Sequence, residues 1–367
     1  MAKQNLPRSL SSSRRDRRDF LRSASLGAMA LAIPFPVLPD FLKNASMGIV
    51  VHSYASRWHS KSESEKFPAF TDAISLMEHC KSIGAGGIQV TVGGWSSDFG
   101  AKVRAKREEL DMYLEGSIAL PQDLGKVPDF EREVIVAKES GASILRTACL
   151  SGRRYTNFTS KEDFLMFKEN AIRSIELAEP IMRKHKMKLA VENHKDWTAQ
   201  ELKQIIQSVG SEWVGVTLDF GNNVSFMENP MEVIQTLAPC AFSTHVKDMG
   251  VQNYSDGFLL SEVPLGEGIV DLPTAVEICR KHNPAINFNL EMITRDPLEI
   301  PVLTESYWTT FEHLSGLDVC KMQRMLDENQ FKGELPRVAG LSQEEQLAFE
   351  ESNILECLQY SRESLKL

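Results

Sequence analysis

Four stretches of this chain share one pattern, an apolar strand-like run that ends in an acidic residue or a histidine. Side chains at the ends of different strands can meet only if those ends lie on one side of a sheet, as in parallel strands joined by helices. The pattern therefore predicts parallel strands whose polar groups gather at their carboxyl ends. The runs span residues 188–194, 214–222, 241–248 and 286–291, and they carry Glu192, Asp219, His245 and Glu291.

The same alternation continues along most of the chain. Strand-end signals recur near residues 54, 92, 118, 149, 193, 219, 245 and 291. Spacings of about 25 to 45 residues suit eight βα units and predict an α/β fold, a TIM (β/α)8 barrel. No Gly-x-Gly-x-x-Gly follows the first expected strand, which counts against a two-domain nucleotide-binding enzyme.

The length of 367 residues suits one barrel of about 250 residues with extensions. A capping box at Ser342 opens a last expected helix, whose apolar stripe must be buried. We expect that stripe to pack on the outside of the barrel or on a second subunit, which leaves a homo-oligomer open. The predicted parts are a signal peptide at 1–32, a linker at 33–46, the barrel at 47–315 and a C-terminal helical extension at 316–367.

The N-terminus predicts export. Arg17 and Arg18 precede a Phe-Leu pair and a further Arg, and a short apolar region with an Ala-x-Ala site follows. This order resembles a twin-arginine signal and predicts a periplasmic protein. The alternatives are a basic arm that touches nucleic acid, or a solvated tail.

Composition narrows the partners. The net charge is −9, and removing residues 1–32 takes away seven basic and two acidic residues, leaving about −14. Such an acidic body does not seek nucleic acid non-specifically. No apolar run reaches the roughly 18 residues of a membrane span. Six scattered cysteines without a Cys-x-x-Cys pair predict no essential disulfide.

Glu192, Asp219, His245 and Glu291 make an oxygen-rich set with one imidazole. Such a set suits Mn²⁺, Mg²⁺ or Co²⁺, with Zn²⁺ left open. A single acidic residue at a strand end is more often a helix cap or an ion-pair partner. Four in succession argue against independent structural accidents, so the set predicts one divalent metal site.

These motifs together resemble the sugar phosphate isomerase/epimerase family, the xylose-isomerase-like barrels, over about residues 47–315. The resemblance implies that the four residues bind one divalent metal and that Glu192 and Glu291 also move protons. Several epimerases carry His three residues after the metal Asp, where this chain has Asn222. The motifs are Glu192-Asn-His, Leu218-Asp219 with Asn222, His245-Val-Lys-Asp, the loop 265–271 and Glu291.

Five residues are candidates for substrate binding, namely His52, His194, Asn222, Lys247 and Glu267. His52 and Tyr54 lie two apart in the first expected strand, so they face the barrel mouth together or fill its interior. Lys247 binds a substrate oxygen or pairs with Asp248 or another carboxylate. Glu267 reaches a sugar hydroxyl or caps the helix that begins near Asp271.

Two further positions carry weaker hypotheses. Glu115 touches substrate or, as we favour, forms a structural ion pair. Arg153 and Arg154 follow the fourth expected strand, where they bind an anionic group or belong to a solvated surface run.

The favoured function is isomerisation or epimerisation of a small carbohydrate or polyol, by removal of a proton next to a carbonyl to give an enediolate. One alternative is a lyase or dehydratase that acts on a keto-sugar, an inosose or a 3-keto-glycoside through the same first step. Another is a non-catalytic sugar-binding protein, which does not need two opposed carboxylates at a metal. A nuclease is disfavoured by the acidic body and by the few His ligands.

Overall fold

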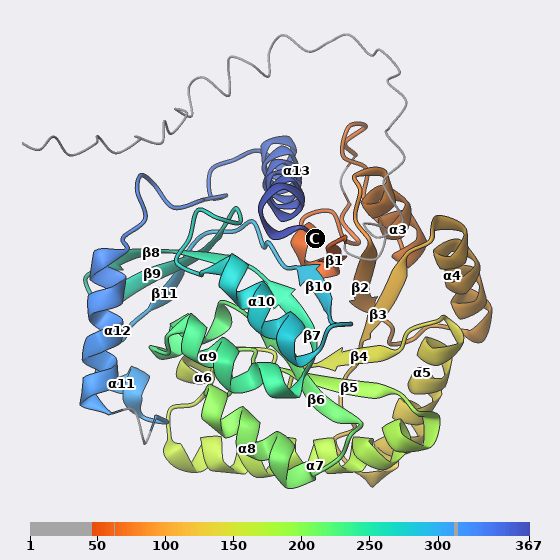
Figure 1. Cartoon of the computed structure of the whole chain (residues 1–367), viewed down its shortest axis with the longest axis horizontal. Coiled ribbons are helices and arrows are strands. Elements are labelled where there is room, and N and C mark those ends of the chain that lie inside the picture. The colour runs from red at the N-terminus through yellow and green to blue at the C-terminus, as the bar shows by residue number, and fades with distance from the viewer. Residues whose placement is uncertain (1–45, 62, 312–314) are drawn as a thin grey trace, which may run out of the picture. The chain divides into compact units, whose positions relative to one another are not determined.

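The computed structural model describes residues 46–61, 63–311 and 315–367 (Figure 1). The predicted signal peptide and nearly all of the predicted linker lie outside the described residues.

Eight parallel strands close into a barrel in the order β1-β10-β7-β6-β5-β4-β3-β2, which confirms the predicted TIM barrel. Each strand is short and mostly buried. The barrel strands are β1 Gly48–Val50, β2 Gly87–Thr91, β3 Tyr113–Ser117, β4 Ile144–Thr147, β5 Lys188–Glu192, β6 Val214–Asp219, β7 Ala241–Val246 and β10 Asn287–Leu290.

Helices surround the barrel and return the chain to the amino end of the next strand (Figure 1). Side-chain caps start most of them; Thr198 and Glu201, for example, form a complete capping box on α8. The helices after successive strands are α3 Ala73–Ser82, α4 Ser97–Leu110, α5 Val127–Glu139, α7 Lys161–His185, α8 Ala199–Val209, α9 Pro230–Leu237 and α10 Leu272–His282. None of the described helices is long and apolar enough to span a bilayer.

A small antiparallel sheet interrupts the βα alternation, and sequence patterning did not predict it. It has the order β11-β9-β8, with β8 Asp248–Tyr254, β9 Gly257–Val263 and β11 Leu298–Ile300. A second hydrophobic cluster lies under it, to which α12 Gly316–Glu328 contributes Met322 and Leu326. Two short helices, α6 Arg154–Asn157 and α11 Glu305–Trp308, pack on each other nearby.

The first strand is shorter than predicted. β1 ends at Val50, and Val51–Tyr54 form the 3₁₀ helix η1. Because a 3₁₀ helix does not alternate faces, Tyr54 does not share the direction of His52. The Tyr54 hydroxyl instead lies 2.9 Å from Nε2 of His79 on α3, away from the barrel mouth, so its predicted placement was wrong.

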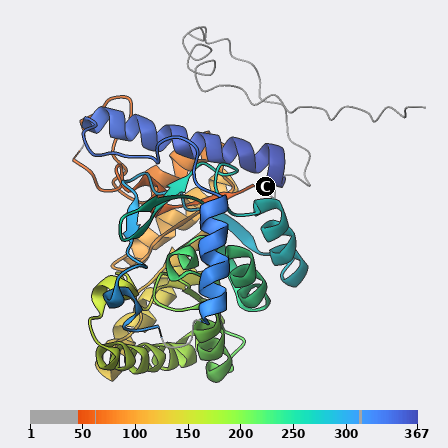
Figure 2. The same ribbon diagram turned by 90° about the vertical axis from the view of Figure 1, so that its left-hand side faces the viewer.

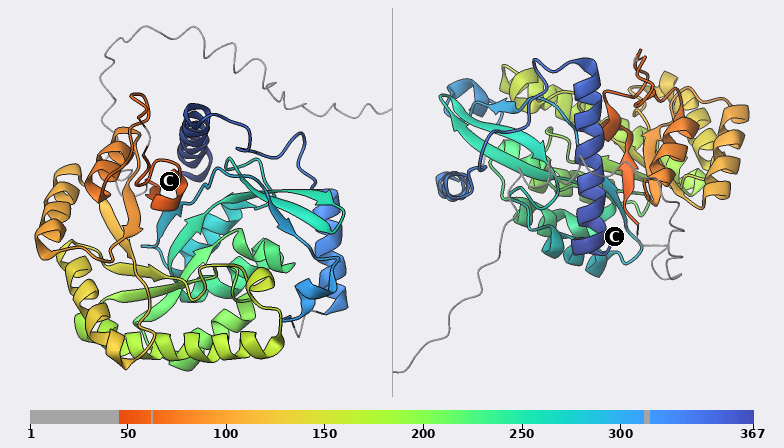
Figure 3. Two further views of the ribbon diagram at one scale, coloured as in Figure 1. Left: turned by 180° about the vertical axis from the view of Figure 1, so that it is seen from behind. Right: turned by 90° about the horizontal axis from the view of Figure 1, so that it is seen from above.

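The C-terminal helix α13 Gln343–Tyr360 packs on the barrel itself, which is one of the two predicted outcomes for its apolar stripe. Ile354, Cys357 and Leu358 belong to the main hydrophobic core. α13 runs beside the first segment of the barrel in every view (Figures 1–3), and it contacts η1. The chain therefore closes the ring of helices with its last long element.

Candidate metal centre and active site

The four residues predicted to bind a metal come together at the carboxyl ends of their strands. Each of Glu192, Asp219, His245 and Glu291 offers one ligand atom, and these atoms all lie within 4.8 Å of one another. All four side chains are buried. Residues on β5, β6, β7 and just after β10 meet because these strands are neighbours in the closed barrel.

Backbone groups orient Asp219. Its Oδ1 accepts hydrogen bonds from the backbone N–H groups of Gly221 at 2.9 Å and Asn222 at 2.7 Å. The Asn193 side chain bridges to the Asp219 backbone, donating to its C=O and accepting from its N–H at 2.8 Å each. The remaining oxygen, Oδ2, faces the cluster, 3.8 Å from Nδ1 of His245.

A chain of side chains orients His245. The amide of Gln89 donates to Glu115 at 3.0 Å, so its Oε1 is the atom that accepts from Nε2 of His245 at 2.7 Å. Nδ1 of His245 then faces the carboxylates, 3.5 Å from Oε2 of Glu192 and 3.5 Å from Oε1 of Glu291. The imidazole therefore presents Nδ1 to any cation held between them.

The prediction that Glu115 forms a structural ion pair was wrong. Its carboxylate accepts hydrogen bonds from neutral donors, and burial raises its pKa. The barrel interior holds this carboxylate because amide and hydroxyl groups replace its hydration. The donors are Gln89, Ser243, Asn287 and Asn289.

The cluster fits a cation. Oδ2 of Asp219 and Nδ1 of His245 are buried and have no hydrogen-bond partner among the described residues. Nζ of Lys247 lies 2.8 Å from Oδ2, an ion-pair distance without hydrogen-bond geometry. Unsatisfied buried polar atoms are costly, and a metal ion would satisfy both. The cluster could therefore bind a divalent metal.

Arg146 on β4 binds Glu192, a pairing that the sequence patterns did not reveal. Nε of Arg146 donates to Oε2 of Glu192 at 2.5 Å, with both residues buried. Burial would raise the pKa of Glu192, but Arg146 and His245 outweigh it and hold the pKa well below its usual range. Glu192 is therefore ionised and fixed in place.

Lys247 pairs with metal-site carboxylates and not with Asp248. Its Nζ donates to Oε2 of Glu291 at 2.5 Å. Burial alone would raise the pKa of Glu291, yet Lys247 and His245 hold it well below its usual range. Asp248 instead accepts backbone N–H groups from Gly266 at 3.0 Å and Gly268 at 2.9 Å, which anchors the loop 264–271.

His52 and His194 lie at the centre, at its more exposed edge. Nδ1 of His52 is 3.1 Å from Oε1 of Glu291, and the side chain is 43% exposed. Nδ1 of His194 donates to the Leu150 carbonyl at 2.9 Å, which leaves Nε2 as its acceptor. Burial lowers the pKa of His194 to about 4, so this ring is neutral near pH 7.

Asn222 lies directly against the centre, whereas Glu267 is exposed. Nδ2 of Asn222 donates to Oε1 of Glu192 at 3.1 Å. Glu267 lies on the loop 264–271, and α10 is capped by Asp271, so the alternative that Glu267 caps this helix was wrong.

Residues 121–309, slightly more than half of the chain, match the sequence profile of the xylose isomerase-like TIM barrel family. The chain belongs to this family. The 3-oxo-isoapionate decarboxylase of Pectobacterium atrosepticum is 23% identical over 248 residues, which cover 66% of this chain and 84% of that protein.

Two crystal structures share the fold. A D-psicose 3-epimerase, solved in the presence of D-fructose, has a TM-score of 0.57 at 16% identity, covering 88% of this chain and 100% of that one. A xylose isomerase-like TIM barrel protein from Mycobacterium smegmatis, in complex with magnesium, has a TM-score of 0.53 at 15% identity, covering 78% and 99%.

The structure of this family member adds one cation that the sequence patterns did not single out. Lys195 is 5% exposed, and its Nζ donates to Oδ1 of Asn222. Burial, together with the charge of Lys247, lowers the pKa of Lys195 to about 8. The backbone φ of Lys195 is positive, at 79°, and the sequence alone does not reveal this conformation.

Arg154 is structural, so both alternatives for it were wrong. The side chain is 2% exposed, and Nη1 donates to Glu201 at 2.6 Å. Its guanidinium also lies 3.6 Å from the centre of the Phe164 ring. Burial against these partners removes Arg154 as a binding site for a ligand anion.

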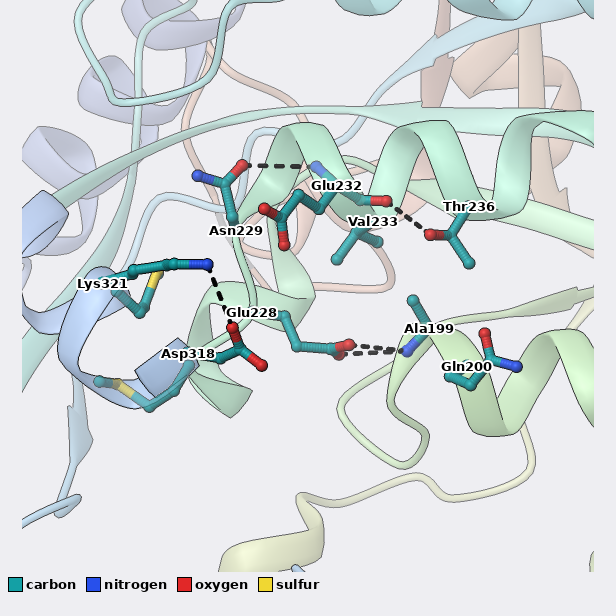
Figure 4. A pocket seen from close by; sticks show the side chains of 11 residues that line it. Ala199, Gln200, Glu228, Asn229, Glu232, Val233, Thr236, Asp318 and Lys321 are labelled. Carbon is teal, nitrogen blue, oxygen red and sulfur yellow. Dashed lines mark hydrogen bonds and ion pairs between the residues drawn. The ribbon is translucent and has the colours of Figure 1, made fainter. Parts of the chain in front are cut away.

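A surface cavity of about 250 Å³ lies apart from the centre, between α8, α9 and α12 (Figure 4). Glu228 reaches from this cavity to the backbone N–H of Ala199 at 3.1 Å, and Asp318 and Lys321 stand across from it. No residue of the metal cluster lines this cavity. Two of its acidic residues have local partners, since Glu228 accepts from the first turn of α8 and Asp318 pairs with Lys321 on α12.

Proposed function

We propose that this chain is a metal-dependent isomerase or epimerase of a small carbohydrate, acting by proton removal next to a carbonyl. The observation that carries the proposal is the meeting of two ionised glutamates and one imidazole at a point that fits a cation. The named relatives include an epimerase and a decarboxylase, which favours an enzyme over a non-catalytic sugar-binding protein.

Glu192, Asp219, His245 and Glu291 would hold one divalent ion, with Mn²⁺, Mg²⁺ or Co²⁺ preferred by the donor set and Zn²⁺ open. When bound, the ion supplies Lewis-acid polarisation of a carbonyl and stabilises the enediolate charge. The M. smegmatis protein is in complex with magnesium, which supports a hard divalent ion here.

Glu291 is the better placed base. Its Oε1 lies 3.1 Å from His52, the more exposed of the two histidines at the site, so a proton taken from substrate has a path onward. In the proposed step a C–H proton moves to the Glu291 carboxylate, the C–H pair forms the C=C bond, and the carbonyl pair moves to oxygen. The reverse step on the other face makes an epimer, and proton return at the neighbouring carbon makes an isomer.

Glu192 occupies the other side of the set. Arg146 and Asn222 hold its two oxygens, so its position is fixed. To deliver a proton to the opposite face of the enediolate, Glu192, which starts ionised, would first have to accept one from solvent. Nε2 of His194 would accept a hydrogen bond from a substrate hydroxyl, because its Nδ1 is committed to Leu150.

Elimination or decarboxylation is the second candidate. The match covers 84% of the 3-oxo-isoapionate decarboxylase, a relative whose name says that it removes CO₂ from an oxo acid. Asn222, an amide, stands where several epimerases carry His, and an amide does not carry protons near neutral pH. A lyase acting on a keto-sugar, an inosose or a 3-keto-glycoside would also start from an enediolate.

Incubation of metal-loaded protein with ketoses, oxo-sugars and oxo acids in D₂O, followed by proton NMR and CO₂ detection, tests the proposal. We expect deuterium beside the carbonyl and an isomeric sugar. An enone, a released alcohol or CO₂ with no isomer would assign the second candidate. Absence of both exchange and products across the panel would refute an enzyme of either kind.

We also propose export by the twin-arginine route, supported by Arg17, Arg18 and the apolar region that follows. Replacing both arginines by lysine should keep the protein in the cytoplasm, measured by fractionation with a periplasmic marker. Unchanged periplasmic yield would refute it.

A further inference from the structure

Lys195 is a buried cation whose role the proposed reaction does not yet use. It follows His194 at the end of β5, and its backbone adopts a left-handed φ of 79°. Lysine rarely adopts this conformation, so tertiary contacts must hold it there. Its backbone carbonyl accepts from the N–H of Arg154 at 2.9 Å, which ties Lys195 to α6, in the segment that follows β4.

Two ammonium groups meet at Asn222. Nζ of Lys195 donates to Oδ1 of Asn222, and Nζ of Lys247 lies 3.4 Å from the same oxygen. Lys247 has Glu291 as a direct carboxylate partner, whereas the Lys195 ammonium, among the described residues, donates to the neutral amide of Asn222. An ammonium carries three N–H donors, so Lys195 has donors to spare beside the centre.

The charges around Lys195 leave it without a carboxylate of its own. Arg295, whose charge acts on Lys195, is already held by Glu262 through two contacts of 3.1 and 2.6 Å. Asp196, next in the chain, accepts the backbone N–H groups of Leu150, His194 and Trp197, and burial raises its pKa to about 7.

A divalent ion would add positive charge close to an ammonium that, among the described residues, has no carboxylate partner. Arg146, Lys247 and Arg295 are each paired with a carboxylate, whereas Lys195 donates to the amide of Asn222. Two more positive charges nearby make this ammonium costlier to hold in a poorly solvated interior. A bound group with negative charge would offset that cost.

We infer that the substrate is a sugar acid whose carboxylate is held by Lys195 beside Asn222. The inference rests on the proposed function, and it narrows its substrate class from neutral sugars to uronic, aldonic or related oxo acids. Lys195 is then a substrate-binding residue that selects for charge, and Asn222 positions its ammonium.

Ligand binding tests the inference without turnover. We would titrate metal-loaded protein with D-gluconate and with D-glucitol, its uncharged counterpart, by calorimetry. Gluconate should bind at least tenfold more tightly. Lys195→Asn suits a left-handed backbone and removes the charge, and it should weaken gluconate by about 10- to 100-fold, as expected for a lost charged hydrogen bond, with glucitol unchanged.

Lys321→Met is the matched control, because it removes a lysine whose side chain is 64% exposed on α12. It should bind gluconate as the parent does. Lys195→Arg, which keeps a fork for carboxylates, should recover part of the affinity.

Equal binding of the two ligands by the parent protein would overturn the inference even if Lys195→Asn fails to fold. So would full gluconate affinity in a folded Lys195→Asn protein, since the acid would then bind elsewhere. Failure of the proposed function has a different signature, gluconate binding that depends on Lys195 without deuterium exchange in any oxo-sugar or oxo acid.

Discussion

His52 and Arg146 give the two active-site glutamates different surroundings. Glu291 contacts a histidine that is 43% exposed, while Glu192 contacts an arginine whose side chain is 10% exposed. The first arrangement lets a proton move toward solvent, and the second fixes a charge. Glu192 and Glu291 are therefore suited to different roles, although their side chains are chemically identical.

Replacing His52 with Asn should lower kcat about 100-fold, because a positioned proton carrier typically contributes about that much. Metal content, measured by elemental analysis, should stay unchanged, since His52 is outside the four-residue set. His59→Asn is the control, as His59 is exposed and has a positive φ that Asn tolerates. An unaltered kcat in His52→Asn would remove His52 from the mechanism.

Replacing Arg146 with Met should destabilise the fold by about 3–5 kcal/mol, because it leaves the Glu192 charge buried without its partner. Urea denaturation of the metal-free protein measures this change. Arg104→Met is the control, because its ion pair with Glu108 joins side chains that are 57% and 53% exposed and should contribute under about 1 kcal/mol. Equal losses in both variants would show that Glu192 does not depend on Arg146.

At the element scale, α13 connects the C-terminal part of the chain to the segment that carries His52. Oε1 of Glu350 accepts the backbone N–H of Ser56 at 2.7 Å, and Glu351 binds Arg57 at 2.7 Å. Asn353 donates to Thr294, just beyond β10, at 2.9 Å. One helix thus holds both loops that flank Glu291, so the precision of the site depends on an element far away in sequence.

Glu350 makes this contact dependent on pH. Burial raises its pKa to about 7, so the folded state favours the protonated carboxyl. Burying this carboxyl does not lower the free energy of unfolding below its unfolded pKa of about 4.3. The full loss of stability is reached as pH rises above about 7. The stability of Glu350→Gln relative to the parent should therefore increase by about 1–3 kcal/mol from pH 5 to pH 8.

Urea denaturation at both pH values measures this gain. Glu344→Gln, at an exposed position in the first turn of α13, should give the same difference from the parent at both values. A gain in Glu350→Gln that does not change with pH would contradict a buried carboxyl with a raised pKa.

In the whole molecule, the stability of the barrel depends on the charges gathered at the metal site. Three carboxylates are brought together by strand closure, and their repulsion is balanced by Arg146, Lys247 and, in the proposed enzyme, a metal. A ligand that binds the folded state alone stabilises it by mass action. The metal should therefore raise the melting temperature as well as permit catalysis.

Adding Mn²⁺ at about 100 times its Kd to chelator-treated protein should stabilise the fold by about 2.7 kcal/mol, which amounts to several degrees in Tm. Asp219→Asn should lose most of that shift, because Oδ2 faces the cluster. Asp318→Asn, an exposed acid on α12, should keep it. Scanning calorimetry would sink the metal proposal if Mn²⁺, Mg²⁺, Co²⁺ and Zn²⁺ all left the parent Tm unchanged.

The sequence alone determined the features that depend on near neighbours in the chain. Apolar runs and capping residues predicted the βα units, because strand and helix periodicity act over a few residues. The four strand-end residues followed from those units, since parallel strands must present their carboxyl ends on one side. Their meeting within 4.8 Å depends in addition on the closure of the barrel, which makes the four strands neighbours.

Only the tertiary structure decided which partners those residues have. Arg146 and Glu192 are 46 positions apart, Gln89 and His245 are 156 apart, and Ser56 and Glu350 are 294 apart. Such pairs follow from barrel closure, and no local pattern encodes them. Arg154 is another example, because its local sequence does not tell whether its side chain is exposed or packed on Phe164. Lys195 needed the fold most, since burial and a left-handed backbone are consequences of packing.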